Sequence, residues 1–145
     1  MANYLTRFSC VLPLGKPEDV PLARIIYDEL AAELLKHEAT TPGFTLSVAP
    51  DSTETALLLV SDDAADPEWV ISFVLRCAAA FNLQGRWGFS WADTCSRPST
   101  DGFGGGAHVI DLTRRNSLGW IDCSHWLRLE LGQAVSNAPM EGSVA

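Results

Sequence analysis

The stretch DPEWVISFVLRCAAAF, residues 66–81, predicts the helix around which the rest of the fold is arranged. Asp66 is a favourable N-cap residue, and Pro67 suits the first helical position. Glu68 places a carboxylate at the positive end of the helix dipole. The helix that follows is apolar on nearly every side, with two polar side chains in its middle. A helix of this kind lies either inside a core or under a partner.

Four further elements are predicted before this helix. Residues 4–12 alternate between apolar and polar side chains and predict a first strand. An apolar stripe of helical spacing predicts a helix from Asp19 to about His37. Two short apolar runs, residues 44–48 and 56–60, are separated by a polar turn and predict a hairpin.

Three strands and a helix are predicted after residue 81. The strands are RWGFSWAD (86–93), AHVIDLT (107–113) and LGWID (118–122), and we expect them to pair antiparallel. Asp122 can cap a third helix that begins near Cys123. The run WLRLEL (126–131) also alternates and fits a strand, so both interpretations of this segment remain open.

The element order is therefore βαββαβ followed by ββα. It predicts an α+β two-layer sandwich, in which a mainly antiparallel sheet of five or six strands carries helices on one face. A ferredoxin-like βαββαβ core would be extended by a β-hairpin and a C-terminal helix. The chain has 145 residues, of which 47% are hydrophobic. We expect a single α+β domain over residues 1–131 and a flexible tail over residues 132–145.

Charge is spread unevenly along the chain. The net charge is −8, and residues 1–72 hold four Lys or Arg against twelve Asp or Glu, whereas residues 73–145 hold six of each. Binding to a phosphate backbone depends on Lys and Arg contacts, so we expect no direct nucleic-acid partner. The acidic half either keeps the protein soluble or meets a basic protein surface.

The sequence shows no targeting pattern. The N-terminus lacks a basic leader and a long apolar region, and the apolar residues 69–81 are interrupted by Arg76 and too few to span a bilayer. We therefore expect a cytoplasmic protein without a membrane partner. The four cysteines are widely spaced and form no CxxC pair, so we expect free thiols in a reducing compartment.

The glycine-rich segment TDGFGGGAH, residues 100–108, raises the question of nucleotide binding. Gly102, Gly104 and Ala107 fit the pattern GxGxxG/A, but a strand pattern follows them, whereas a dinucleotide site needs a helix there to hold the pyrophosphate. We therefore expect no bound cofactor. Two interpretations remain for this segment, a loop whose glycines take positive φ values or an anion-binding nest of backbone N–H groups.

Three aromatic residues, Trp87, Phe89 and Trp91, alternate along one predicted strand and project from one face. As core residues they would lie under the helices, because large aromatic side chains dominate protein cores. As surface residues they would anchor a partner. On the second interpretation, the candidate binding residues are Trp87, Phe89, Trp91, Asp101, Gly102, Phe103, Gly104 and Gly105.

The chain carries no complete catalytic motif. If the fold brings them together, Cys95 can act as a nucleophile with His108 as its base and Asp111 or Asp93 as the residue that orients the base. The cysteines and histidines do not have the paired spacing of zinc ligands. We therefore expect no metal site and keep catalysis as the alternative.

The segment from Trp87 to Leu127, WGFSWADTCSRPSTDGFGGGAHVIDL…GWIDCSHWL, resembles small uncharacterised proteins of proteobacterial phages and mobile elements. The resemblance covers under a third of the chain and brings no site residue with it. It implies a setting in which small acidic proteins bind and block a host protein, as anti-CRISPR and other anti-defence proteins do.

Together these observations predict a non-enzymatic protein-interaction module that binds another protein, such as a host protein that it inhibits, or a second copy of itself. The alternative is a small enzyme or ligand-binding domain that uses Cys95, Asp101, the glycine-rich segment and His108.

Overall fold

The helix predicted over residues 66–81 is present in the computed structural model, which describes residues 4–50, 55–97 and 102–132. This helix, α2 (Pro67–Phe81), begins where the Asp66 carboxylate accepts the backbone N–H of Glu68 at 3.0 Å. It ends at Asn82, whose backbone is left-handed. The first helix, α1 (Asp19–His37), also has the predicted bounds.

The third helix, α3 (Cys123–Glu130), forms in preference to the alternative strand. The Asp122 carboxylate accepts the backbone N–H of His125 at 2.9 Å, so Asp122 caps the helix as predicted. This cap satisfies one of the free N–H groups at the helix start and stabilises the helical conformation over the alternating pattern.

The first predicted strand is divided into β1 (Tyr4–Arg7) and β2 (Ser9–Pro13), with Phe8 between them. At Phe8 the chain pairs with Ser61, whose backbone N–H donates to the Phe8 carbonyl and whose Oγ accepts the Phe8 N–H, each at 3.0 Å. The Phe8 side chain is buried among aromatic rings. As a result, the chain pairs within one sheet before Phe8 and within a second sheet after it.

The strands form two antiparallel sheets where one sheet was predicted. The three-stranded sheet has the order β2-β4-β3, with β3 at Phe44–Val48 and β4 at Ala56–Ser61. The four-stranded sheet has the order β1-β5-β6-β7, with β5 at Arg86–Cys95, β6 at Gly104–Asp111 and β7 at Asn116–Asp122. The described residues thus hold seven strands, one more than predicted at most, because residues 4–12 supply two.

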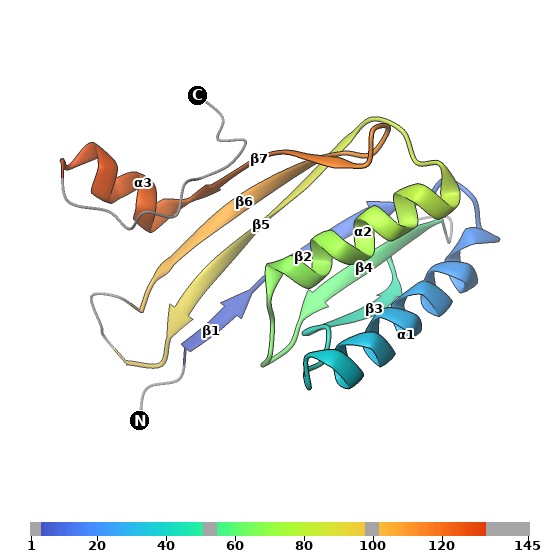
Figure 1. The fold of residues 1–145 in the computed structure, drawn as a ribbon, viewed down its shortest axis with the longest axis horizontal. Coiled ribbons are helices and arrows are strands. Elements are labelled where there is room, and N and C mark those ends of the chain that lie inside the picture. Colours follow the sequence, from blue (N-terminus) through green and yellow to red (C-terminus); the bar gives the residue numbers. More distant parts are fainter. Residues whose placement is uncertain (1–3, 51–54, 98–101, 133–145) are drawn as a thin grey trace.

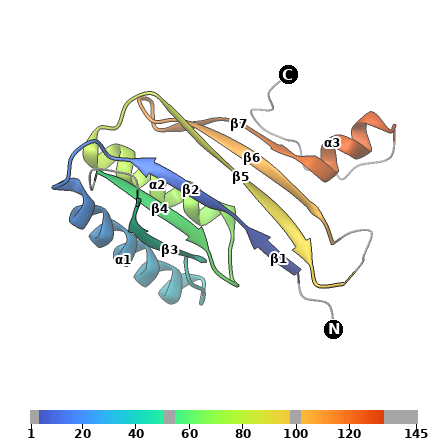
Figure 2. The same cartoon turned by 180° about the vertical axis from the view of Figure 1, so that it is seen from behind.

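Helices α1 and α2 lie side by side against one face of the three-stranded sheet (Figure 1), and the view from behind shows the strands in front of them (Figure 2). An ion pair between Arg76 of α2 and Glu33 of α1, 2.6 Å long, joins the two helices. The core beneath them contains Phe44 and Phe73, whose ring centroids are 5.7 Å apart. The prediction of helices on one face of antiparallel strands is confirmed for this part of the molecule.

Helix α1 also protects the edge of the three-stranded sheet. The Tyr27 hydroxyl donates to the Phe44 carbonyl at 2.6 Å, and the Arg24 guanidinium donates to the Leu46 carbonyl at 2.7 Å. Both acceptors belong to the edge strand β3. An edge strand whose carbonyls already have donors is a poor template for a strand from another chain.

The four-stranded sheet extends away from α1 and α2 towards α3 (Figure 1). We call this part the distal end: it comprises β1, the end of β5, the start of β6, the end of β7, and α3. None of the helices in the described ranges is long and apolar enough to cross a membrane. Most of the predicted tail, from residue 133 onwards, lies outside the described residues.

Candidate binding surfaces

The glycine-rich segment contributes to a strand and does not form a phosphate-binding loop. Strand β6 begins at Gly104, three residues earlier than predicted, and pairs with β5 from its first residue. At Gly105 the φ angle is 152°, and a Cβ there would lie 2.4 Å from the Trp91 carbonyl oxygen. A Cβ at Gly106 would lie 2.5 Å from the Trp91 ring. The glycines therefore allow the two strands and the indole ring to approach one another closely.

The remaining candidate binding residues of the glycine-rich segment differ in burial. Gly102 is buried, whereas the neighbouring Phe103 is 54% exposed. Asp101 lies outside the described residues. Phe103 is therefore the member of the segment that presents a large apolar side chain to solvent.

The aromatic row of β5 runs from the core towards the distal end. Trp87 and Phe89 are buried, and their rings stack at 5.5 Å between centroids. The Trp87 Nε1–H donates to the Val11 carbonyl at 2.8 Å, which satisfies the indole inside the core. Trp91, half-buried, continues the row at 5.6 Å from Phe89. The core interpretation therefore describes Trp87 and Phe89, and Trp91 is the member of the row that retains exposed area.

The structure does not bring Cys95 close to His108. His108 pairs with Phe89 across β5 and β6, and Cys95 lies six residues further along β5. At about 3.3 Å per residue, the two side chains are roughly 20 Å apart along the strands. Asp111 lies on the opposite face of β6 from His108, because side chains three apart on a strand point to opposite faces. The alternative of a nucleophile, base and orienting carboxylate therefore fails at this site.

Three of the four candidate side chains, those of Asp111, Asp93 and His108, instead make structural contacts. The Asp111 carboxylate accepts the Arg114 backbone N–H at 3.2 Å in the turn after β6. The Asp93 carboxylate accepts the Thr6 hydroxyl at 2.8 Å between β5 and β1. His108 is 8% exposed, its Nε2 lies 2.8 Å from Ser117 Oγ, and burial lowers the pKa of its imidazole. Each of these roles stabilises the sheet or its turns.

The cysteines are four free thiols. Burial raises the pKa of Cys10 to about 11 and that of Cys77 to about 12, so both are protonated at neutral pH. A protonated thiol is a poor nucleophile. Within the described part of the chain, no three His, Cys, Asp or Glu side chains gather in a way that could hold a metal ion.

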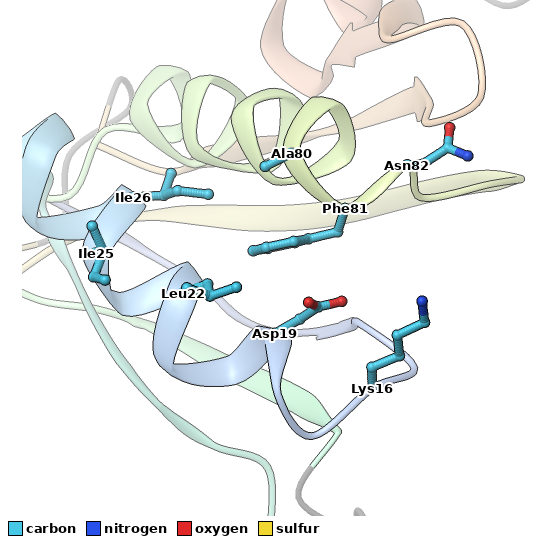
Figure 3. Close-up of a pocket in the computed structure, with 8 residues that line it drawn as sticks. All are labelled: Lys16, Asp19, Leu22, Ile25, Ile26, Ala80, Phe81 and Asn82. Atoms are coloured by element: carbon cyan, nitrogen blue, oxygen red, sulfur yellow. The ribbon is translucent and has the colours of Figure 1, made fainter.

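An open groove lies between the start of α1 and the end of α2 (Figure 3). Its volume is about 490 Å³, and Leu22 and Ile25 on its α1 side are 48% and 53% exposed. The Phe81 ring projects from the end of α2 into the groove, while Lys16 and Asn82 lie at one end of it (Figure 3). We call this the helix groove; it is lined by Lys16, Asp19, Leu22, Ile25, Ile26, Ala80, Phe81 and Asn82.

The helix groove was not found from the sequence, because Leu22 and Ile25 belong to an apolar stripe that is equally typical of a buried helix face. The sequence feature that could have indicated the groove was the width of the apolar stripe on α1. Leu22 and Ile25 widen it beyond Ala23, Leu30 and Leu34, which are the buried residues of α1.

A second exposed apolar region lies at the distal end. Seven large apolar side chains there are between 38% and 61% exposed, and no side chain of α3 is buried. They are Tyr4, Phe103, Ile121, Trp126, Leu127, Leu129 and Leu131. Tyr4 and Ile121 lie at opposite edges and on opposite faces of the four-stranded sheet, so the seven do not form one continuous surface. Phe103 was expected to contribute to binding, whereas the exposure of the three α3 residues, Trp126, Leu127 and Leu129, was missed, although their apolar pattern is visible in the sequence.

The two regions differ in charge. Helix α1, beside the helix groove, carries Asp28, Glu29 and Glu33 on exposed positions. Helix α3 carries one cation, Arg128, and one anion, Glu130.

Models of protein families, curated proteins and solved structures were compared with this chain, and none of them matches it.

Proposed function

We propose that this chain is a non-enzymatic protein-binding module, whose helix groove takes a basic, amphipathic segment of another protein. The observation that carries the proposal is the exposure of Leu22 and Ile25 at the wall of a groove of about 490 Å³. Exposed apolar side chains gathered in a concave surface are typical of binding sites. One or two large apolar side chains of the partner would fill the groove.

The charges around the groove support a basic partner. Asp28, Glu29 and Glu33 are exposed on α1, and of these Glu33 pairs with Arg76. The groove itself is lined by one cation, Lys16, and one anion, Asp19, and Arg24 of α1 is directed to the carbonyl of Leu46 on β3. The outer face of α1 is therefore acidic, and an acidic surface attracts Lys and Arg side chains of a partner and increases the association rate.

A peptide-display selection against the immobilised chain tests this proposal. We expect the selected peptides to combine large apolar residues with Lys or Arg, and to bind Ile25→Asp at least about tenfold more weakly than the wild type, since a central apolar contact contributes more than 1 kcal/mol. Leu35→Asp is the matched control, because Leu35 is exposed on the same helix but does not line the groove. Its affinity for the peptides should remain close to that of the wild type.

Two results would count against the proposal. Selected peptides without Lys or Arg would remove the argument from charge. Peptides that bind Ile25→Asp and the wild type equally well would place the binding surface outside the helix groove. The measurement is a titration of each variant with the same labelled peptide at two salt concentrations, since screening weakens an electrostatic contribution.

We propose further that the partner is a bacterial host protein and that the chain acts in the cytoplasm as an anti-defence protein of a phage or mobile element. The support is the resemblance of the segment from Trp87 to Leu127. Expression of the chain in a strain with CRISPR immunity should restore plating of the targeted phage, and Ile25→Asp should abolish that effect. No change in plating with the wild type would contradict an anti-CRISPR role.

We also propose that the two sheets derive from one ferredoxin-like βαββαβ plan. The support is that β1 and β2 are separated by Phe8 alone, and that β1 pairs with β5 while β2 pairs with β4. If β2 and β1 are taken as one strand, the strand order β3-β4-β2 of the first sheet continues into β1-β5 of the second. An experimental structure in which β1 does not pair with β5, or β2 does not pair with β4, would contradict this relation.

A further inference from the structure

We propose that one end of the helix groove binds an Asp or Glu side chain of the partner segment, which fixes the direction in which that segment lies. The inference rests on the proposed function and adds a third kind of partner residue to the apolar and basic ones. Lys16 and Asn82 lie at this end of the groove (Figure 3), and Arg115, from the turn between β6 and β7, contacts Asn82 there. We call these three residues the groove end.

Asn82 leaves a hydrogen-bond donor at the groove end, because its side-chain oxygen is already occupied. Asn82 Oδ1 accepts the Arg115 guanidinium at 3.3 Å and the Gln84 side-chain amide at 3.0 Å. A guanidinium only donates hydrogen bonds, so this contact identifies the atom as the oxygen. Within the described residues, the Asn82 Nδ2 group and the other N–H groups of the Arg115 side chain have no acceptor, so they can donate to a ligand.

The groove end is also positively charged. The two ion pairs of the described residues join other side chains, so neither Lys16 nor Arg115 is paired with a carboxylate in this part of the chain. Asp19 is the one carboxylate that lines the groove, against two cations at the groove end. In a chain with a net charge of −8, two unpaired cations form a local site for an anion.

The backbone of Arg115 supports a role for its side chain. Its φ angle is 60° and that of Asn82 is 51°, so two of the three non-glycine residues with positive φ in the described ranges contact each other here. Asn adopts this conformation readily, whereas for Arg it is strained, and glycine would adopt it without strain. A strained residue in a position that glycine would suit better is typical of a functional site.

The donors of the groove end suit a carboxylate side chain better than the C-terminus of a chain. A C-terminal carboxylate is bound by a nest of free backbone N–H groups. The backbone N–H groups of Asn82 and Leu83 both donate to the Ala78 carbonyl. That of Arg115 donates to the Asp111 carbonyl at 2.7 Å. The donors that remain belong to side chains, and a guanidinium binds an Asp or Glu carboxylate through two parallel N–H groups.

The opposite end of the groove is acidic. Glu29 is exposed one turn beyond Ile25 on the same side of α1, and the ion pair that joins α1 to α2 follows at Glu33. The geometry therefore assigns the acidic residue of the partner to the groove end, its large apolar residues to the middle of the groove, and its Lys or Arg to the side of Glu29.

Arg115→Gln and Arg114→Gln are matched variants, because both remove one charge from the same exposed turn. Arg115 contacts Asn82, whereas Arg114 pairs with Asp111 at 3.9 Å. We expect a labelled peptide selected on the wild type to bind Arg115→Gln about tenfold more weakly, as for the loss of a hydrogen bond to a charged group, and Arg114→Gln with unchanged affinity. Lys16→Gln should behave like Arg115→Gln, and circular dichroism melting checks that each variant folds.

Changes in the peptide identify the source of the carboxylate. Replacing its Asp or Glu by Asn or Gln should weaken binding to the wild type about tenfold and binding to Arg115→Gln much less, because both changes remove the same contact. A loss caused instead by amidation of the peptide C-terminus would overturn the assignment to a side chain. Equal affinities of Arg115→Gln and Arg114→Gln would overturn the proposal, and the proposed function would still stand if Ile25→Asp weakened binding.

Hexanoate tests the groove end without any selected peptide, because it joins a carboxylate to a short apolar chain. We expect its addition to shift the nuclear magnetic resonance signals of the Arg115 guanidinium and the Asn82 side-chain amide, and hexanamide, which lacks the charge, to shift them much less. Equal shifts with both compounds, or none with hexanoate, would overturn the proposal. Shifts with hexanoate alone, in a chain that no peptide binds, would support the carboxylate site and overturn the proposed function.

Discussion

Helices α2 and α3 begin with the same kind of cap, but they differ in how far their side chains are buried. Each has an aspartate N-cap that accepts a backbone N–H, Asp66 at 3.0 Å and Asp122 at 2.9 Å. Both are rich in apolar residues, yet α2 buries five side chains and α3 buries none. Local sequence chemistry thus starts both helices in the same way, and it does not determine which of them is covered.

The difference lies in the strands beneath them. Helix α2 packs with α1 over strands whose apolar side chains meet it, such as Leu57 and Leu59 of β4. Helix α3 follows β7 at the far end of the other sheet, where its Ser124 lies beside Gly104. Small residues at that end leave little side-chain surface for α3 to cover. The core side of the molecule therefore holds the side chains whose burial stabilises the fold, whereas the side chains of α3 remain unburied.

The largest contrast is expected between Phe73→Ala in α2 and Leu129→Ala in α3. Phe73 is fully buried, with its ring centroid 5.7 Å from that of Phe44 and 6.1 Å from that of Tyr27. Its truncation leaves a cavity, and we expect a loss of about 3–5 kcal/mol in the free energy of unfolding. Leu129→Ala should change this free energy by less than about 0.5 kcal/mol, as expected for an exposed site. Urea unfolding at one low protein concentration measures both.

Equal losses for these two variants would show that α3 is covered in the monomer, and the contrast between the helices would then be wrong. Repeating the measurement for Leu129→Ala at high concentration separates monomer stability from association, because dimerisation makes apparent stability depend on concentration.

A smaller contrast is expected within β6. A Cβ at Gly106 would lie 2.4 Å from the Ile121 carbonyl oxygen and 2.5 Å from the Trp91 ring, so Gly106→Ala must displace backbone or an indole. We expect it to destabilise the fold by about 1–3 kcal/mol. Gly104→Ala is the control on the same strand, because its nearest neighbour, Ser124 Oγ at 2.9 Å, can rotate away. Thermal unfolding of both variants would test whether the distal sheet is coupled to the core, and equal melting temperatures would argue that it is not.

Removal of the two helix caps should follow the same contrast, with a larger loss of global stability at α2 than at α3. Asp66→Ala removes the cap of a helix that packs on the core, and we expect a loss of about 1 kcal/mol in global stability. Asp122→Ala should instead increase hydrogen exchange within α3 and leave global stability nearly unchanged, because α3 opens locally. Amide exchange measured residue by residue distinguishes these outcomes. A global loss in Asp122→Ala as large as that in Asp66→Ala would contradict the separation of the two regions.

The sequence predicts the helices well because their caps and spacing are local. Asp66 with Pro67, and Asp122 before Cys123, mark helix starts that the structure confirms. The alternation of Trp87 and Phe89 likewise predicts that they share one face of β5, and the structure shows that both are buried, which the sequence had left open. These signals depend on a few neighbouring residues and on the geometry of helices and strands.

Other features depend on which strands meet, and local patterns do not contain that information. Residues 4–12 predict one strand, with Tyr4, Phe8, Cys10 and Leu12 on one face, yet the change of partner at Phe8 divides them between two sheets. The distance between Cys95 and His108 follows from the register of β5 and β6, in which His108 pairs with Phe89, six residues before Cys95. The helix groove depends on how the start of α1 and the end of α2 are placed beside each other, because residues of both line it.

The smallest expected effect concerns His108, which lies on β6 between the two regions. Burial lowers the pKa of its imidazole below the ordinary value of 6.5, so the unfolded chain binds this proton more readily than the folded chain. Stability should therefore fall as pH decreases through 6.5 and level off below the folded pKa. In His108→Gln this part of the pH dependence should disappear, and urea midpoints between pH 5 and 8 measure the difference. Nuclear magnetic resonance titration of the imidazole gives the folded pKa directly. A value at or above 6.5 would contradict the burial of this imidazole as the dominant influence on its pKa.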